Sequence, residues 1–152
     1  NLYESFSQAA RTDNLEAAAQ RADQLMADAG KSAYAAFAAL GLAKLQYQAG
    51  DKEKARQRLQ WVVDNAAEPA VKQLAQLRLA NLLLDMDKPD EAAALAQSVS
   101  QGGFAGEFNA LKGDIALEKG DKEAARQAWQ KALDEGATDV TGLRMKLTSV
   151  GG

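Results

Sequence analysis

The chain has 152 residues and a net charge of -3 at pH 7, so there is no electrostatic reason to expect nucleic-acid binding, which requires a basic stripe. It contains no cysteine and no histidine, which excludes disulfides, thiol chemistry, zinc sites built on these ligands and a histidine general base. Apolar residues make up 47% with alanine dominant, and aromatic residues only 6%, so we expect one all-α domain spanning residues 1–152.

The N-terminal half predicts five helices, most of them with a clear start signal. Asn14, Ser32 and Asp51 can each cap a helix, and Pro69 suits the first turn of another. Trp61 lies off the inward-facing stripe of its helix; we expect it to pack on the next repeat or the groove wall, the alternative being a partner anchor. The expected helices span residues 1–11, 15–29, 33–49, 52–65 and 69–85.

The C-terminal half predicts four more helices. Val99 is expected to face inward near the end of the first of them. The pair Gly102-Gly103 is interpreted as a loop rather than a phosphate cradle, because no strand precedes it and no lysine–serine pair follows it. Gly113 permits close contact with a partner helix, and Thr138 or Asp139 can cap the last helix. The expected helices span residues 89–100, 104–119, the stretch between Asp121 and Gly136, and 139–150.

Four breaks between helices recur along the chain with spacings of 37, 37 and 33 residues. They are Asp13, Gly50, Asp87 and Gly120. An alanine stands five residues after each break, namely Ala18, Ala55, Ala92 and Ala125. Alanine allows two helix backbones to approach closely, and a large side chain such as Trp129 can fill the gap between neighbouring pairs. The pattern resembles degenerate copies of the tetratricopeptide repeat, a helix-turn-helix unit of about 34 residues.

This resemblance implies a right-handed solenoid of about four tetratricopeptide-like helical hairpins closed by a C-terminal capping helix. The hairpins are expected at residues 1–30, 33–66, 69–101 and 105–136, and the capping helix at 139–150.

Longer stretches narrow the resemblance to one family. The most specific is the run from Leu111 to Trp129, L-K-G-D-x-x-L-x-K-G-D-K-x-x-A-R-x-A-W, accompanied by A-L-G-L-A-K-L, R-L-Q-W-V-V-D-N-A and a closing L-R-M-K-L. Together they are similar to the YfgM-type proteins of Gram-negative bacteria, over nearly the whole chain. The resemblance implies a periplasmic repeat domain on a single inner-membrane helix, associated with the Sec translocon and with a membrane-anchored periplasmic chaperone of the prolyl-isomerase class.

The sequence itself holds no stretch of about 18 apolar residues that could span a membrane, and no signal-peptide pattern opens it. It begins with Asn1 rather than Met, so we expect a processed or excised part of a longer protein whose upstream anchor has been removed. On this interpretation the domain is a non-catalytic scaffold on the periplasmic face that helps hand over unfolded secreted clients. The alternative is a soluble intracellular tetratricopeptide adaptor with no membrane link.

Partner binding is expected on the concave surface, which the first helix of each hairpin lines in tetratricopeptide stacks. The aromatic and arginine side chains are typical interface anchors, and the flanking charges can orient a bound peptide. The alternative is that the aromatics complete the core and the charges form a solvated inner face. The expected binding residues are Tyr3, Phe37, Lys44, Tyr47, Arg78, Asn81, Asp85, Asp114 and Glu118.

An enzyme is the competing functional class, and only carboxylates, lysines and tyrosines remain for acid–base work. The carboxylate pairs fall at helix caps and on exposed helix faces, where a solvated or capping role is expected. They are Asp51-Glu53, Asp90-Glu91, Asp114-Glu118 and Asp121-Glu123. We therefore predict no catalytic residues, no metal ligands and no cofactor.

Overall fold

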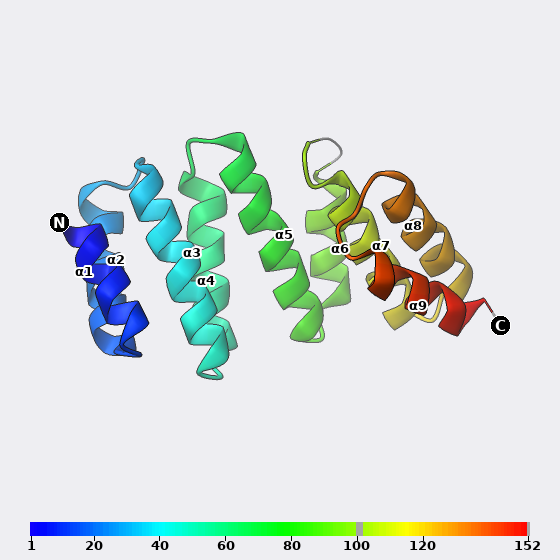
Figure 1. Cartoon of the computed structure of the whole chain (residues 1–152), viewed down its shortest axis with the longest axis horizontal. Helices are drawn as coiled ribbons and strands as arrows, with labels where there is room; N and C mark the ends of the chain where they lie inside the picture. The colour runs from blue at the N-terminus through cyan, green and yellow to red at the C-terminus, as the bar shows by residue number, and fades with distance from the viewer. Residues whose placement is uncertain (100–101, 152) are drawn as a thin grey trace. The chain divides into compact units, whose positions relative to one another are not determined.

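The computed structural model describes residues 1–99 and 102–151, and every regular element in these ranges is a helix (Figure 1). The helices are α1 (Leu2–Arg11), α2 (Leu15–Asp28), α3 (Ala33–Gln48), α4 (Lys52–Asn65), α5 (Pro69–Asp85), α6 (Pro89–Gln97), α7 (Ala105–Glu118), α8 (Lys122–Asp134) and α9 (Val140–Val150). Their bounds follow the sequence predictions closely, with one exception in α6.

Helix α6 ends at Gln97, three residues before the predicted end at Ser100, which lies outside the described residues. The hydroxyl of Ser98 donates to the carbonyl of Leu95 at 2.6 Å, and such local bonds from a serine side chain compete with helix continuation. Val99 consequently lies beyond the helix and is half-buried, so its predicted place on the inward stripe of a longer helix is wrong.

The four repeat breaks share one backbone conformation. Each break residue has a positive φ: 55° at Asp13, 87° at Gly50, 61° at Asp87 and 85° at Gly120. Glycine adopts this left-handed region without steric cost, and aspartate tolerates it better than most other residues. The repeat spacing read from the sequence therefore marks a physical event, the left-handed residue that ends the first helix of each hairpin.

The residue after each break starts the next helix. In three repeats its side chain accepts a hydrogen bond from a backbone N–H three residues further on, as Asn14, Asp51 and Asp121 do. In the third repeat this position is Lys88, which makes no side-chain cap, and Pro89 follows it at the first helical position. Proline has no N–H to satisfy there, so this helix start needs one fewer acceptor.

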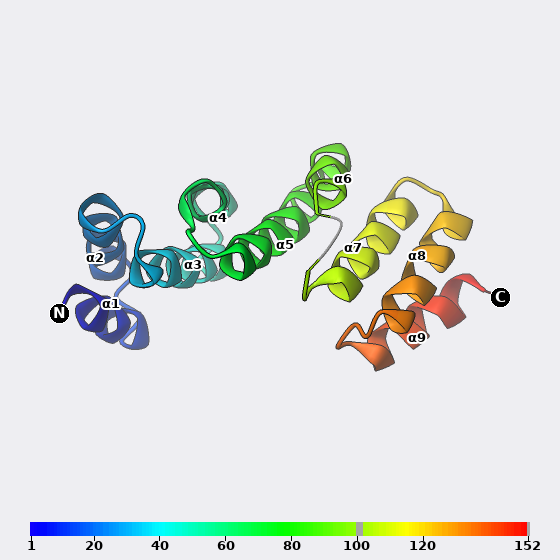
Figure 2. The ribbon, with the colours of Figure 1, turned by 90° about the horizontal axis from the view of Figure 1, so that it is seen from above.

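The chain forms two compact units, Asn1–Leu79 and Ala80–Gly152, and the division falls within α5. In the first unit α1 packs on α2 and α3, and α3 packs on α2 and α4, which Figure 2 shows from above. Phe6 fills the space between the first hairpin and α3, and a Cβ added at Gly41 would lie 3.2 Å from the Phe6 ring. The buried cluster consists of Phe6, Ala9, Ala18, Ala22, Leu25, Ala35, Ala38 and Leu42.

Trp61 of α4 packs against this same cluster and lies beside Gly30, at 3.6 Å from the position of an added Cβ. The contact is with the preceding repeat, whereas the sequence predicted packing on the next repeat or the groove wall, or a partner anchor. Arg58, one helical turn earlier, forms an ion pair with Asp23 of α2, so the two contacts together join α4 to α2.

In the second unit α7 packs on α6 and α8, and α8 packs on α9. Trp129 of α8 is fully buried, at 0% exposed, and it lies directly against Gly113 of α7. A Cβ added at Gly113 would stand 2.3 Å from the indole ring, so only glycine fits at this crossing. The buried cluster consists of Ala125, Trp129, Ala132, Ala137 and Leu143, and α9 supplies Leu147 and Val150 as half-buried neighbours.

Gly113→Ala should destabilise the chain even though alanine favours a helix over glycine by about 1 kcal/mol. The added methyl group would press on a buried ring that cannot move aside, and such overpacking costs about 1–3 kcal/mol. Thermal and urea melting should therefore show a loss of stability. Gly103→Ala is the matched control, because an added Cβ there meets no atom within 4 Å.

The partner of the clash can be removed to check its origin. Trp129→Ala should itself cost about 3–5 kcal/mol by leaving a cavity. On that background Gly113→Ala should no longer destabilise. A melting temperature for Gly113→Ala at or above that of the wild type would contradict the helix contact.

Candidate partner-binding surface

The nine predicted binding residues come from four helices that are the first of their hairpins. Five belong to the first unit and four to the second, and each set is described by itself. All are exposed except Tyr3 and Asp114, which are half-buried. In the first unit they are Tyr3 of α1, Phe37, Lys44 and Tyr47 of α3, and Arg78 of α5; in the second they are Asn81 and Asp85 of α5, and Asp114 and Glu118 of α7.

Helix α3 carries the densest group of exposed aromatic side chains. Phe37 and Tyr47 are each 45% exposed, and Tyr34 is 60% exposed. The sequence analysis did not include Tyr34 among the binding residues, although it precedes Phe37 by three positions and so shares its side of the helix. We call Tyr34, Phe37, Lys44 and Tyr47 the α3 surface.

Tyr3 supports this surface from the neighbouring helix. Its ring centroid lies 5.2 Å from that of Tyr34 at a tilt of 44°, and 6.2 Å from that of Phe6. Tilted aromatic pairs at these distances are favourable beyond the area they bury. Tyr3 therefore links the exposed Tyr34 to the buried core through Phe6, and it is as much a packing residue as a surface one.

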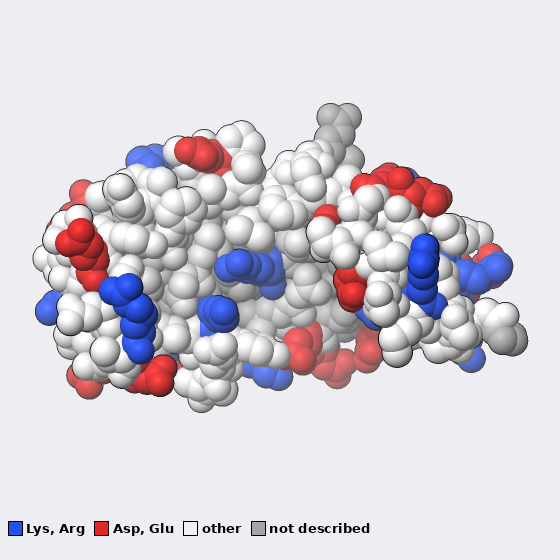
Figure 3. Space-filling model, viewed as in Figure 1, with Lys and Arg blue, Asp and Glu red and all other residues white. Residues whose placement is uncertain are grey.

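The charged residues of α3 and of the first-unit part of α5 are all basic. Lys44 is the only charged residue of α3. The part of α5 that belongs to the first unit adds Lys72 and Arg78 and no acidic residue. On the face shown in Figure 3, basic and acidic groups lie in small separate clusters among a larger uncharged area. The α3 surface is thus aromatic and weakly basic in a chain whose net charge is negative.

Asp114 makes structural contacts that the sequence analysis missed. Its Oδ1 accepts a hydrogen bond from Trp129 Nε1 at 3.1 Å and pairs with Lys146 Nζ at 2.8 Å. The same indole N–H also points to the carbonyl of Ala110 at 3.2 Å, and Lys146 Nζ lies 5.8 Å from the Trp129 ring centroid. Asp114 therefore joins α7, α8 and α9, whether or not it also contacts a partner.

The carboxylates considered as an enzyme alternative have local structural roles. Asp51 and Asp121 cap helices, and Asp90 pairs with Lys119 at 2.6 Å, linking α6 to α7. Within the described ranges, no group of three or more carboxylates lies close enough to hold a metal ion. These contacts give Asp51, Asp90 and Asp121 structural roles, and the absence of catalysis stays a prediction.

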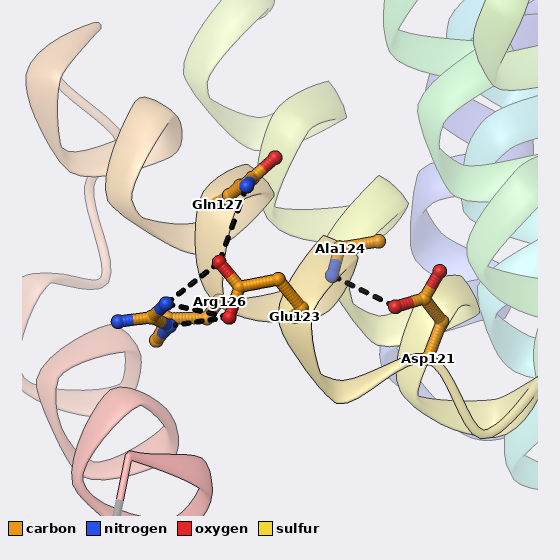
Figure 4. Close-up of polar contacts among 5 residues, drawn as sticks. All are labelled: Asp121, Glu123, Ala124, Arg126 and Gln127. Atoms are coloured by element: carbon orange, nitrogen blue, oxygen red, sulfur yellow. Dashed lines mark hydrogen bonds and ion pairs between the residues drawn. The ribbon is translucent and has the colours of Figure 1, made fainter.

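Glu123 shows how such a carboxylate behaves at the start of α8 (Figure 4). Arg126 donates to both of its oxygens, with Nη2 at 2.6 Å from Oε1, and Gln127 Nε2 donates at 3.2 Å. The hydrogen bonds from Arg126, and then that from Gln127, hold the pKa of Glu123 below its ordinary value. The group is fully exposed, so it works as part of a solvated helix start rather than as a catalytic acid.

Comparison with known proteins places this arrangement in a family. Residues 1–152, the whole chain, match the family described as tetratricopeptide repeat-like domain. The chain belongs to this family. The family match agrees with the repeated left-handed breaks and with the hairpins that they separate.

Three curated relatives share one name, "Ancillary SecYEG translocon subunit". The one from Escherichia coli K12 is 29% identical, and the match covers 77% of this chain and 57% of the relative. That from Aggregatibacter actinomycetemcomitans is 28% identical over 89% of this chain and 67% of the relative. That from Neisseria gonorrhoeae is 30% identical over 76% and 57% respectively. The chain thus spans little more than half the length of two of these relatives, and the resemblance to YfgM-type proteins is confirmed.

A solved tetratricopeptide repeat protein from Parabacteroides merdae has the same fold. It superposes with a TM-score of 0.68 at 22% identity, covering 99% of this chain and 57% of that chain. The predicted all-α, tetratricopeptide-like fold class is confirmed, while the handedness of the stack stays a prediction. None of the helices described here has the length and apolar character needed to cross a membrane.

Asp114→Ala and Lys146→Ala should show coupled losses of stability. Their side chains are 29% and 43% exposed, so we expect a coupling of about 0.5–1 kcal/mol in a double-mutant cycle. Asp114→Ala alone should cost more than Lys146→Ala, because it also removes an acceptor from the buried indole N–H. Urea melting of the four proteins gives these values. Strictly additive losses would show that the ion pair does not couple α7 to α9.

Arg126→Ala should raise the pKa of Glu123 toward its ordinary value, because Arg126 supplies the largest of the effects that lower it. Gln127→Ala should raise it less. A lowered pKa means that the charged carboxylate favours the folded chain above its ordinary pKa, and that this contribution is lost as the pH falls through the lowered value. Carboxyl carbon chemical shifts in an NMR pH titration follow the change. An unchanged titration in Arg126→Ala would contradict the assignment.

Proposed function

We propose that this chain is the protein-interaction domain of an ancillary subunit of the SecYEG translocon. The observation that carries the proposal is the family match over residues 1–152 together with relatives that all bear the translocon-subunit name. The domain acts as a scaffold: it holds partner proteins on helix surfaces and performs no chemistry of its own. The exposed aromatic side chains of the α3 surface support this role, because aromatics are the usual anchors of protein interfaces.

We further propose that the domain lies on the periplasmic face of the inner membrane, tethered by a single upstream helix. There it associates with a membrane-anchored chaperone of the prolyl-isomerase class and helps hand over unfolded secreted clients. The support is the sequence resemblance to YfgM-type proteins, in particular the run from Leu111 to Trp129. Reporter fusions at the C-terminus of the full-length protein test the side of the membrane, and cytoplasmic reporter activity would favour the intracellular-adaptor alternative.

The central proposal is tested by co-purification from bacterial membranes. The full-length protein should co-purify with affinity-tagged SecYEG. When residues 1–152 are deleted from it, the chaperone and the clients should no longer co-purify with SecYEG. A version without this domain that retains every partner would overturn the scaffold role. The measurement needs no knowledge of which helix surface is used.

The double change Tyr47→Ala with Arg78→Ala should weaken binding of the chaperone by at least about 2 kcal/mol, which is about thirtyfold. Both residues belong to the first unit and are exposed, so the melting temperature should hardly change. Biolayer interferometry against the purified chaperone measures the effect. Lys122→Ala with Met145→Ala, exposed residues of the second unit, is the matched control. Unchanged binding in the folded double variant would move the interface to another surface.

A further inference from the structure

We propose that the α3 surface binds an acidic segment of a partner protein, one in which Asp or Glu residues stand next to large apolar side chains. The inference rests on the proposed scaffold function and specifies the chemistry of the segment that the scaffold holds. Three properties of α3 support it: the exposure of its aromatics, the side of the helix on which they lie, and the sign of the charge between them.

The exposed aromatics are concentrated to an unusual degree. The chain has four Phe, three Tyr and two Trp, and the three of these with the largest exposure all lie on α3. Tyr34 at 60%, Phe37 at 45% and Tyr47 at 45% are far more exposed than Trp129 at 0% or Phe108 at 2%. Single exposed apolar residues need no explanation, but a group on one helix marks an interaction site.

The opposite side of α3 is fully committed to the core. Ala35, Ala38 and Leu42 are each 0% exposed and belong to the cluster around Phe6. Tyr34, Phe37 and Lys44 follow at steps of three and seven residues, so they lie on one stripe of the helix. Tyr47 lies seven residues after the buried Leu40, outside this stripe, and is exposed near the end of the helix. The stripe borders the buried cluster, because Gly41 lies against the Phe6 ring and Tyr34 contacts Tyr3. Tyr34, Phe37 and Lys44 are nevertheless exposed, so a partner can contact them without disturbing the packing of the first unit.

The charge on this stripe selects the partner. Lys44 is the only charged residue among the 16 residues of α3, and residues 69–79 add two basic residues and no acidic one. An apolar segment without charge would bury part of Lys44 unpaired, and a basic segment would be repelled. Carboxylates beside apolar side chains pair with Lys44 while the apolar groups cover Phe37 and its aromatic neighbours.

The test uses the 152-residue chain and three fluorescein-labelled peptides of equal length. The peptides share the same Leu and Phe positions, and the intervening residues are Glu in the first, Gln in the second and Lys in the third. Fluorescence anisotropy should show the Glu peptide binding at least about tenfold more tightly than the Lys peptide, with the difference shrinking as salt rises. Equal affinity for the three peptides, or no binding of the Glu peptide, would overturn the proposal.

Two variants and their controls locate the binding. Phe37→Ala should weaken binding of the Glu peptide at least about tenfold. Lys44→Glu should reverse the preference, so that the Lys peptide binds more tightly than the Glu peptide. Met145→Ala and Lys122→Glu make matched changes at exposed positions of the second unit. They should leave the affinities for the Glu and Lys peptides unchanged. Circular dichroism melting confirms that each variant is folded. Equal effects of test and control variants would show non-specific attraction and overturn the proposal.

A second copy of this chain is the competing occupant of the surface. Sedimentation of the wild type and of Phe37→Ala distinguishes it: a dimer that dissociates in the variant would show that α3 meets another α3, and the proposal would be wrong. The scaffold function is measured separately by co-purification with SecYEG. If SecYEG and its partners still co-purify but the three peptides bind equally well, this inference is wrong and the proposed function is unaffected.

Discussion

The close approach of α7 to α8 depends on one contact, that of Gly113 with the buried ring of Trp129. An indole this large fits between two helices only because the facing position has no side chain at all. The ring then fixes the polar groups around it, because its N–H needs an acceptor and finds one on Asp114. Asp114 in turn binds Lys146, which lies over the ring and so holds α9 against the pair. Replacement of the glycine would thus disturb three helices, because the displaced ring carries the contacts to Asp114 and Lys146 with it.

In the first unit the helices are packed mainly through smaller side chains. Alanines fill the inward side of α2 and α3, and Phe6 is the one large ring in their cluster. Because alanine covers little area, backbones lie close and the core needs few aromatic side chains. The aromatics of α3 are outside this buried cluster and keep 45–60% of their surface exposed. In the first unit the buried residues that hold the hairpins together are therefore mostly alanines, whereas most of the aromatic rings are at least partly exposed.

Much of the fold could be predicted from the sequence because its signals are local. The breaks at Asp13 and Gly120 are read from residue type, and the structure finds a left-handed backbone at both. The early end of α6 could not be foreseen in this way. The apolar pattern permits another helical turn, and the hydrogen bond from the Ser98 hydroxyl to the Leu95 carbonyl, which favours an earlier end, is not visible in the sequence. The site was harder to predict. Helical periodicity gives the side on which a residue lies, yet it does not reveal that Tyr34 stays exposed or that Asp114 is engaged by an indole and a lysine from two other helices.

Net charge is a poor guide to the partner of this domain, because several charged groups of both signs are paired or cap helices within it. Asp51, Asp121 and Asp139 cap helices, and Asp90 and Asp114 pair with lysines of neighbouring helices. Each ion pair cancels one charge of either sign, so the net charge of -3 is unchanged by pairing and does not give the sign of the charge at any one surface. The lysine of the α3 surface has no acidic neighbour on its own helix, so its charge is not offset there. The local sign of the field, rather than the sign of the whole chain, therefore decides which segments α3 attracts.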